Sequence, residues 1–199
     1  MKNFYFAFKN LFYIYLTAYN RLEVKGREHI PREGGLIVIS NHSSYLDPLI
    51  IGAAVDRRMT YLAKKELFTV SLVGKFVSSF ALPVSRDGSS HTMIKETVKR
   101  LCRGEAIAMF PAGERDKGGD GSATGFKRGV ELLARLSKAP VLPVYIRGAD
   151  KSLPVGGKFP RPAKISVQFA PCLSADDPDD PEKNIISRAM ESIGRLKTA

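Results

Sequence analysis

Residues 36–48 read LIVISNHSSYLDP, and this stretch decides the predicted fold. Its first part, Leu36 to Ile39, is a short apolar run in which β-branched residues predominate, as is typical of a strand buried on both faces. Its last part, Asp47-Pro48, is typical of a helix start, with Asp47 as the N-cap and the proline in the first turn. A buried strand, a short polar loop and a helix in succession indicate one half of a βαβ unit.

The rest of the chain repeats this alternation. Further apolar, β-rich runs predict strands at residues 59–63, 106–110, 141–146 and 165–169. Helical patterns lie between them, and one of these begins at Ser89 or Ser90 and ends near Gly104. A last helix runs through Ile185 and Ile193. The sequence therefore predicts an α/β fold in which residues 21–199 form a single domain, with a mostly parallel central sheet flanked by helices.

Residues 1–20 differ from everything that follows. They hold eight of the eighteen Phe and Tyr residues of the chain. Lys9 interrupts the apolar run, which falls short of the roughly 18 apolar residues expected of a spanning helix. Aromatic side chains with polar tips favour the headgroup region, and Lys2, Lys9, Arg21 and Lys25 are suited to meet anionic lipid there. We expect an N-terminal amphipathic membrane-associated helix; a buried core helix is the alternative.

Composition narrows the partners and the compartment. Thirty-one Lys and Arg against twenty Asp and Glu give a formal net charge of +11, which favours anionic partners. No nucleic acid is expected, because the basic residues are dispersed and no zinc-finger, helix-turn-helix or RNA-recognition signature is evident. Cys102 and Cys172 lie far apart without a CxxC motif, which indicates a reducing, cytosol-facing location and no zinc site. Cys102 is predicted to be a core thiol on the apolar side of its helix.

His42 follows the buried strand directly, at its carboxyl end, where ligands bind in open α/β sheets. Four residues separate His42 from Asp47, so the loop can turn back and bring the carboxylate against one imidazole nitrogen. The other nitrogen would face substrate, as a general base requires. The alternative is that Asp47 only caps its helix while His42 bonds a loop carbonyl. Because no GxSxG elbow supplies a nucleophile, direct attack by an acceptor hydroxyl activated by His42 is the chemistry that this pair favours.

Residues 41–47 resemble the NHx4D motif of the glycerolipid acyltransferase family, which includes bacterial 1-acylglycerol-3-phosphate acyltransferases. Three further blocks follow in the family's order at residues 82–87, 110–115 and 141–144, with an FKxG-like element at 126–129. The resemblance covers roughly residues 22–148. The third block, at 110–115, departs from the family's usual FPEGTR, with Ala112 in place of glutamate and Glu114 in place of threonine.

The resemblance implies roles for individual side chains. His42 and Asp47 are the implied catalytic pair. Arginine offers a planar fork that matches phosphate oxygens, and glycine lets the backbone approach a ligand closely. The implied phosphate-binding residues are Arg86, Gly113, Arg115 and Lys127, with Asn41 and Glu114 as supporting candidates.

The resemblance also implies a reaction, in which a fatty acyl group moves from acyl-CoA or acyl-acyl carrier protein to lysophosphatidic acid and gives phosphatidic acid. It implies no bound cofactor, no metal and a peripheral or monotopic place on the cytoplasmic face of a phospholipid membrane. The alternative acceptors are another lyso-lipid or glycerol 3-phosphate, and Ala112 keeps open an acceptor without phosphate, such as a lyso-amino-lipid. A non-catalytic lipid-binding homologue is the remaining alternative.

Overall fold

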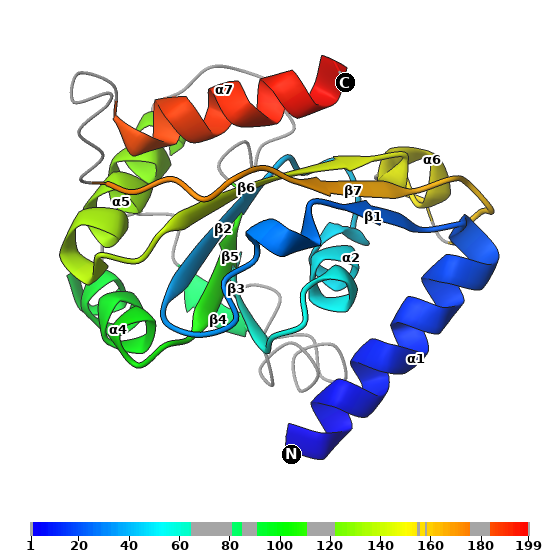
Figure 1. Ribbon diagram of the computed structural model, residues 1–199, viewed down its shortest axis with the longest axis horizontal. Coiled ribbons are helices and arrows are strands. Elements are labelled where there is room, and N and C mark those ends of the chain that lie inside the picture. Colours follow the sequence, from blue (N-terminus) through cyan, green and yellow to red (C-terminus); the bar gives the residue numbers. More distant parts are fainter. Residues whose placement is uncertain are drawn as a thin grey trace.

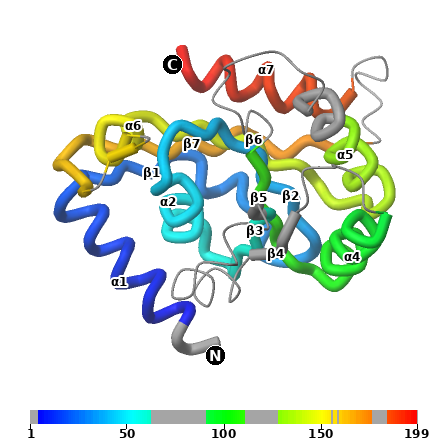
Figure 2. Tube along the Cα trace, turned by 180° about the vertical axis from the view of Figure 1, so that it is seen from behind, coloured from blue at the N-terminus to red at the C-terminus, as the bar shows by residue number. Residues whose placement is uncertain are grey.

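The structure is a computed structural model that describes residues 2–64, 81–84, 91–110, 122–154, 156–157, 159–175 and 184–198, with the backbone alone at 2–4, 63–64, 81–84 and 122–127. A central sheet lies between two sets of helices (Figure 1). The helices on one side of the sheet are α1 (Lys2–Asn20) and α2 (Asp47–Ala54), and those on the other side are α4 (His91–Cys102), α5 (Ser122–Ser137) and α7 (Ile185–Thr198). Figure 2 shows the same arrangement from behind.

Over the part of the chain that the structure describes, the sheet has seven strands in the order β1-β7-β6-β2-β5-β3-β4. Every neighbouring pair is parallel except β6 and β7, which are antiparallel. The predicted α/β fold with a mostly parallel sheet is therefore confirmed. The strands are β1 (Glu23–Lys25), β2 (Leu36–Ser40), β3 (Met59–Lys64), β4 (Ala81–Val84), β5 (Ala106–Met109), β6 (Val141–Arg147) and β7 (Ser166–Phe169), and the short helices are η1 (Arg27–His29) and α6 (Ala149–Ser152).

Two hydrophobic cores explain why β2 reads as a continuous apolar run. Leu36 and Val38 pack into a cluster with residues of α1 and α2. Ile37 and Ile39 point the other way, into a cluster with residues of α4, α5 and α7. All four side chains are fully buried, as expected for a central parallel strand covered on both faces.

The sequence predictions for Cys102 and Lys9 are wrong. Cys102 is exposed, because it lies about 100° around α4 from Leu101, the residue that the helix buries. Lys9 does not point outward to meet lipid. Its side chain is buried against the protein, and its Nζ lies 3.0 Å from Asp56 Oδ1. The carboxylate of Asp56 stabilises the ammonium group on the inner side of α1. The sequence does not reveal this pair, because the two residues lie 47 positions apart.

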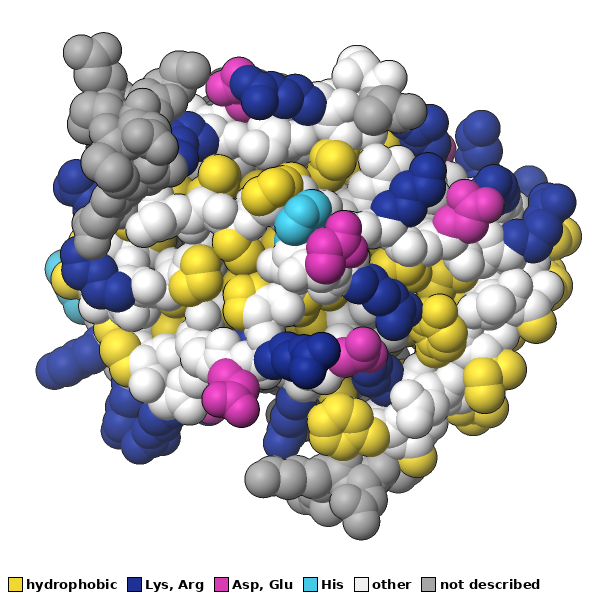
Figure 3. All heavy atoms as spheres, viewed as in Figure 1, with side chains coloured by type: hydrophobic (Ala, Val, Ile, Leu, Met, Phe, Trp, Pro, Cys, Tyr) yellow, Lys and Arg dark blue, Asp and Glu magenta, His cyan; other side chains and the backbone are white. Residues whose placement is uncertain are grey.

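The outer side of α1 is uncharged instead, with Asn10 and Thr17 exposed beside apolar residues. Phe6, Leu11 and Ile14 are exposed, with Leu11 at 68% and Ile14 at 63%. Lys9 is the one charged residue between positions 5 and 20, so the exposed side of α1 over this range carries no charge. Figure 3 shows the hydrophobic side chains that gather along α1 at the right-hand edge of the molecule. None of the described helices is long and apolar enough to cross a bilayer.

Candidate active site

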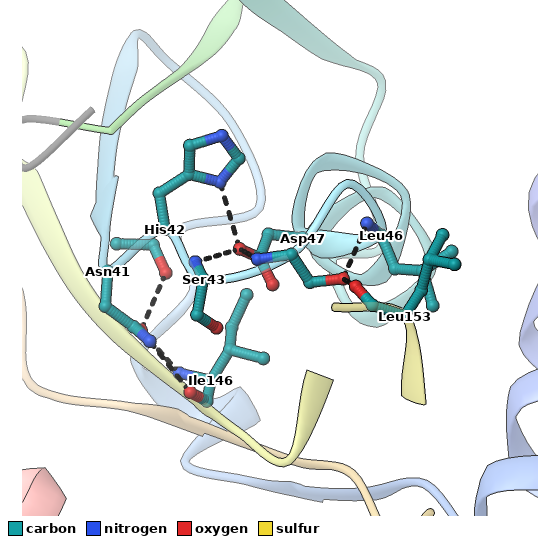
Figure 4. Close-up of polar contacts among 9 residues, drawn as sticks. Asn41, His42, Ser43, Leu46, Asp47, Ile146 and Leu153 are labelled. Atoms are coloured by element: carbon teal, nitrogen blue, oxygen red, sulfur yellow. Dashed lines mark hydrogen bonds and ion pairs between the residues drawn. The ribbon is translucent and has the colours of Figure 1, made fainter. Parts of the chain in front are cut away.

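The loop between β2 and α2 brings His42 and Asp47 together at the carboxyl end of β2 (Figure 4). The Nδ1 atom of His42 lies 2.9 Å from Asp47 Oδ2, the contact that the spacing predicts. Asp47 is fully buried, whereas the His42 side chain is 24% exposed. The second ring nitrogen of His42 points away from Asp47 (Figure 4). A buried carboxylate thus holds one side of a ring whose other side remains reachable.

Asp47 does more than meet His42, and it does not cap its helix as the sequence predicted. Leu46 is the N-cap of α2, with no side-chain cap hydrogen bond, and Asp47 is the first helical residue. The carboxylate turns back into the loop, where Oδ2 also accepts from the Ser43 amide at 2.7 Å and the Ser44 amide at 2.8 Å. These amides need an acceptor within the fold, and the carboxylate satisfies both. Its Oδ1 atom is buried with no hydrogen-bond partner among the described residues.

This geometry selects one tautomer of His42. A carboxylate oxygen that already accepts two amide protons accepts a third from Nδ1, so the neutral ring carries its proton on Nδ1. The Nε2 atom then has a free lone pair, which is what a general base requires. Phe110, the residue after β5, stacks on the His42 ring with centroids 4.5 Å apart and restricts its rotation.

Asn41 connects this loop to the neighbouring strand β6. Its Nδ2 donates to the Ile146 carbonyl at 2.8 Å, and its Oδ1 accepts from the Ile146 amide at 2.8 Å. The side chain therefore completes a pair of hydrogen bonds where β2 leaves the sheet (Figure 4). Asn41 thus fixes the start of the loop that carries His42, with both of its polar side-chain atoms bonded to the main chain of β6.

Ser44 is a positioning residue that sequence reasoning missed. Its side chain is 2% exposed, and its Oγ donates to the Leu153 carbonyl at 2.7 Å and accepts from the Leu46 amide at 3.1 Å. Its amide also bonds Asp47. A serine in a polar loop gives no signal of such contacts, because Leu153 is 109 positions away in the sequence.

The remaining predicted site residues are not placed by the structure. Arg86, Gly113, Glu114 and Arg115 lie outside the described residues, and only the backbone of Lys127 is described, in α5. The strands that precede these residues in the chain, β4 and β5, end at the edge of the sheet that carries His42. In the sheet β5 lies beside β2, with Met109 opposite Ile39, and the parallel strand β4 ends at the same edge.

Cys172 does not offer an alternative nucleophile in this arrangement. Cys172 is half-buried and its Sγ donates to the His29 carbonyl at 3.4 Å. Burial raises the pKa of the Cys172 thiol, which disfavours the reactive thiolate. Among the described residues, no cluster of three or more His, Cys, Asp and Glu side chains is arranged to hold a metal ion.

A parallel α/β sheet with a carboxylate-oriented histidine at its carboxyl edge defines a class of protein equipped for general-base chemistry. The chain is matched over residues 21–147 by the family model described as Acyltransferase. It therefore belongs to the Acyltransferase family.

Individual relatives agree with this assignment. The chain is 27% identical over 190 residues to the 1-acyl-sn-glycerol-3-phosphate acyltransferase of Bacillus subtilis, covering 94% of this chain and 91% of that relative. It is 29% identical over 160 residues to the enzyme of the same name from Limnanthes alba, of which it spans 56%. The crystal structure of the 1-acyl-sn-glycerophosphate acyltransferase PlsC from Thermotoga maritima shares the fold, with a TM-score of 0.70 at 24% identity over 97% of this chain and 78% of that one.

Proposed function

We propose that this chain is an O-acyltransferase that moves a fatty acyl group from a thioester to the free hydroxyl of 1-acylglycerol 3-phosphate. The observation that carries the proposal is the contact between His42 Nδ1 and the buried Asp47 carboxylate, which leaves Nε2 available. The names of the relatives supply the acceptor. The thioester donor is acyl-CoA or acyl-acyl carrier protein, and no bound cofactor takes part.

In the proposed reaction, Nε2 of His42 removes the proton of the acceptor hydroxyl as that oxygen attacks the thioester carbonyl. The C–S bond then breaks, and the departing thiolate takes the proton from the imidazolium. The Asp47 carboxylate stabilises the imidazolium between these two steps, as in other histidine-carboxylate pairs. The ester forms without a covalent enzyme intermediate, so no side-chain nucleophile is needed.

The developing oxyanion needs hydrogen-bond donors, and the described structure narrows the choice. The Ser43 and Ser44 amides already donate to Asp47. At the start of α2 the Asp47 amide donates to the Ser44 carbonyl, and the next residue, a proline, has no N–H. We therefore place the oxyanion donors near Gly113 in preference to these amides of the loop between β2 and α2.

Phosphate recognition is assigned to the basic residues of the blocks that resemble those of the family. Arg86, Arg115 and Lys127 follow or lie beyond strands that end at the His42 edge of the sheet, so they are the proposed clamp for the acceptor phosphate. Gly113 is proposed to let the backbone come close to the phosphate. Glu114 is the proposed partial replacement for the carboxylate that Ala112 lacks.

We further propose that α1 docks the protein on the cytoplasmic face of a phospholipid membrane. Its outward side presents Phe6, Leu11 and Ile14 without charge, while Lys9 is turned inward. Burying Leu11 and Ile14 in the acyl boundary contributes about 1.5–3 kcal/mol for each fully transferred side chain. A lysophosphatidic acid acceptor is itself a membrane lipid, so this position delivers the substrate to the enzyme.

Thiol release from acyl-CoA by the purified protein tests the function, with lysophosphatidic acid, glycerol 3-phosphate and a phosphate-free lyso-lipid compared as acceptors. Release that depends on lysophosphatidic acid and is lost in His42→Ala supports the proposal. The matched control is His91→Ala, an exposed histidine at the start of α4, which should leave turnover unchanged.

Release with the phosphate-free acceptor alone would keep the chemistry but overturn the phosphate clamp. If acyl-CoA gives no release with any acceptor, the assay is repeated with acyl-acyl carrier protein. No release with that donor either would favour a non-catalytic lipid-binding protein.

A further inference from the structure

The segment that follows α6 carries the most exposed large hydrophobic side chain among the described residues. Phe159 is 79% exposed, more than either Leu11 or Ile14 on α1. The sequence around it reads Phe159-Pro160-Arg161-Pro162, in which two prolines stiffen the backbone. A single exposed apolar ring is common on protein surfaces, so its significance depends on whether other apolar side chains and complementary charges lie next to it.

Hydrogen bonds fix the backbone on which Phe159 stands. The Arg161 amide donates to the Ser152 carbonyl at 2.7 Å, and Ser152 Oγ donates to the Arg161 carbonyl at 3.0 Å. Asn20, which is fully buried, donates from Nδ2 to Ser152 Oγ at 2.9 Å and to the Arg161 carbonyl at 3.3 Å. The ring of Phe159 is therefore presented from an anchored loop at the carboxyl end of α1.

Further contacts place the segment of Phe159 beside the carboxyl end of α1. Tyr19, in the last turn of α1, donates from its hydroxyl to the Pro160 carbonyl at 3.3 Å. The carboxyl end of α1 and the α6 region lie together at one end of the molecule in both Figure 1 and Figure 2. The exposed apolar residues of α1 and Phe159 thus belong to neighbouring elements.

Basic side chains surround this end of the molecule. Arg21, Lys151, Arg161 and Lys164 are all exposed. Lys164 pairs with Glu23 at 2.6 Å, which leaves a basic excess in the group. Cations that flank an exposed aromatic ring match a surface with an apolar interior and anionic headgroups.

We propose that Phe159 is a second membrane-inserting element, which enters the same anionic lipid surface as the apolar side of α1. This inference rests on the proposed membrane docking of α1 and adds a second point of contact. The segment is also tied to the candidate active site, because the carbonyl of Leu153 accepts the Ser44 hydroxyl at 2.7 Å. Two contacts with one surface fix the tilt of the protein, so the edge that carries His42 takes a defined position over the membrane.

The chain contains no tryptophan, which allows a single-residue reporter. In Phe159→Trp, emission should shift to the blue when vesicles of phosphatidylcholine and phosphatidylglycerol in equal parts are added, and brominated lipid should quench it. Leu136→Trp is the matched control. Leu136 is 56% exposed on α5, which lies on the other side of the sheet from α1, and the emission of this control should not change.

Vesicle sedimentation supplies the second measurement. Phe159→Ala should weaken partition onto the same vesicles about tenfold, a factor that corresponds to about 1.4 kcal/mol, and Leu136→Ala should leave it unchanged. Vesicle binding by Phe159→Trp without a shift of its tryptophan emission, or equal partition of Phe159→Ala and the parent chain, would overturn this inference while the docking of α1 stands. No vesicle binding by the parent chain would overturn the docking of α1 and this inference together, without bearing on acyl transfer measured with a soluble acceptor.

Discussion

Replacing Asp47 by asparagine separates two roles that the carboxylate combines. In the structure Oδ2 accepts from His42 Nδ1, the Ser43 amide and the Ser44 amide. An asparagine can keep these three hydrogen bonds only with its oxygen at the Oδ2 position, because an NH2 group there would face two main-chain donors. The tautomer of His42 should therefore survive Asp47→Asn, and only the negative charge should be lost.

The size of the loss follows from hydrogen-bond strengths. A hydrogen bond to a charged group contributes about 1.5–3 kcal/mol and a neutral one about 0.5–1.5 kcal/mol. The difference, about 1–1.5 kcal/mol, corresponds to turnover lowered about tenfold. The same change in a serine protease lowers turnover by about 10⁴-fold, because there the histidine adopts the wrong tautomer. The variant also buries an NH2 group at the Oδ1 position, which costs about 1–3 kcal/mol of stability.

Thiol release under saturating substrates gives the turnover number, and nitrogen NMR shifts of the imidazole report the tautomer. Asp150→Asn, at an exposed position of α6, is the matched control and should behave as the parent chain. Asp47→Ala should be worse than Asp47→Asn in both activity and stability, because it leaves the Ser43 and Ser44 amides without their acceptor. A loss of about 10⁴-fold in a folded Asp47→Asn protein, with the proton of His42 moved to Nε2, would refute the reasoning.

Two further substitutions test the supports of the fold. Arg57→Met should lower the free energy of unfolding by about 2–4 kcal/mol, since the guanidinium donates to carbonyls of the 31–34 loop and of Gly104. Urea denaturation measures this loss. Turnover should stay constant, because these loops lie at the amino ends of β2 and β5, whereas His42 lies at the carboxyl end of β2. Asn41→Asp should destabilise the protein by about 2–4 kcal/mol and also lower turnover, because a carboxylate oxygen then faces the Ile146 carbonyl; an unchanged urea midpoint would contradict this.

The sequence predicts the centre of the fold well because central parallel strands must be apolar on both faces. The runs that become β2, β3, β5 and β6 are therefore visible without any structure. The edge strand β1 has three residues, two of them charged and exposed, so no apolar run marks it. The antiparallel direction of β7 cannot be predicted either, because the pattern of apolar residues in a strand does not indicate its direction. The pairing with β6, in which Val144 lies opposite Phe169, reveals it.

The candidate site was predictable in its residues and in the contact of His42 with Asp47, but not in its contacts with the main chain. The order of His42 and Asp47 after a buried strand follows from the sequence. The direction of the Asp47 side chain does not, since Asp-Pro at a helix start looks the same whether the carboxylate caps the helix or turns back to the loop. The decisive partners are main-chain amides, which have no sequence signal. Ser44 is hidden for a related reason, because its partner Leu153 is distant in the chain.

The orientation of α1 is a further feature that the sequence does not reveal, and it matters for the proposed membrane docking. In water, a helix normally exposes its charged residues, whereas α1 turns Lys9 inward and leaves Leu11 and Ile14 exposed. The ion pair of Lys9 with Asp56 does not explain this, because Asp56 is 76% exposed and such pairs contribute at most about 1 kcal/mol. Packing of Leu16 and the neighbouring aromatic rings into the core near α2 fixes the inner side. The outer side is then left without charge between positions 5 and 20, with Asn10 and Thr17 exposed beside Leu11 and Ile14, and this pattern is the basis of the membrane docking proposed for α1.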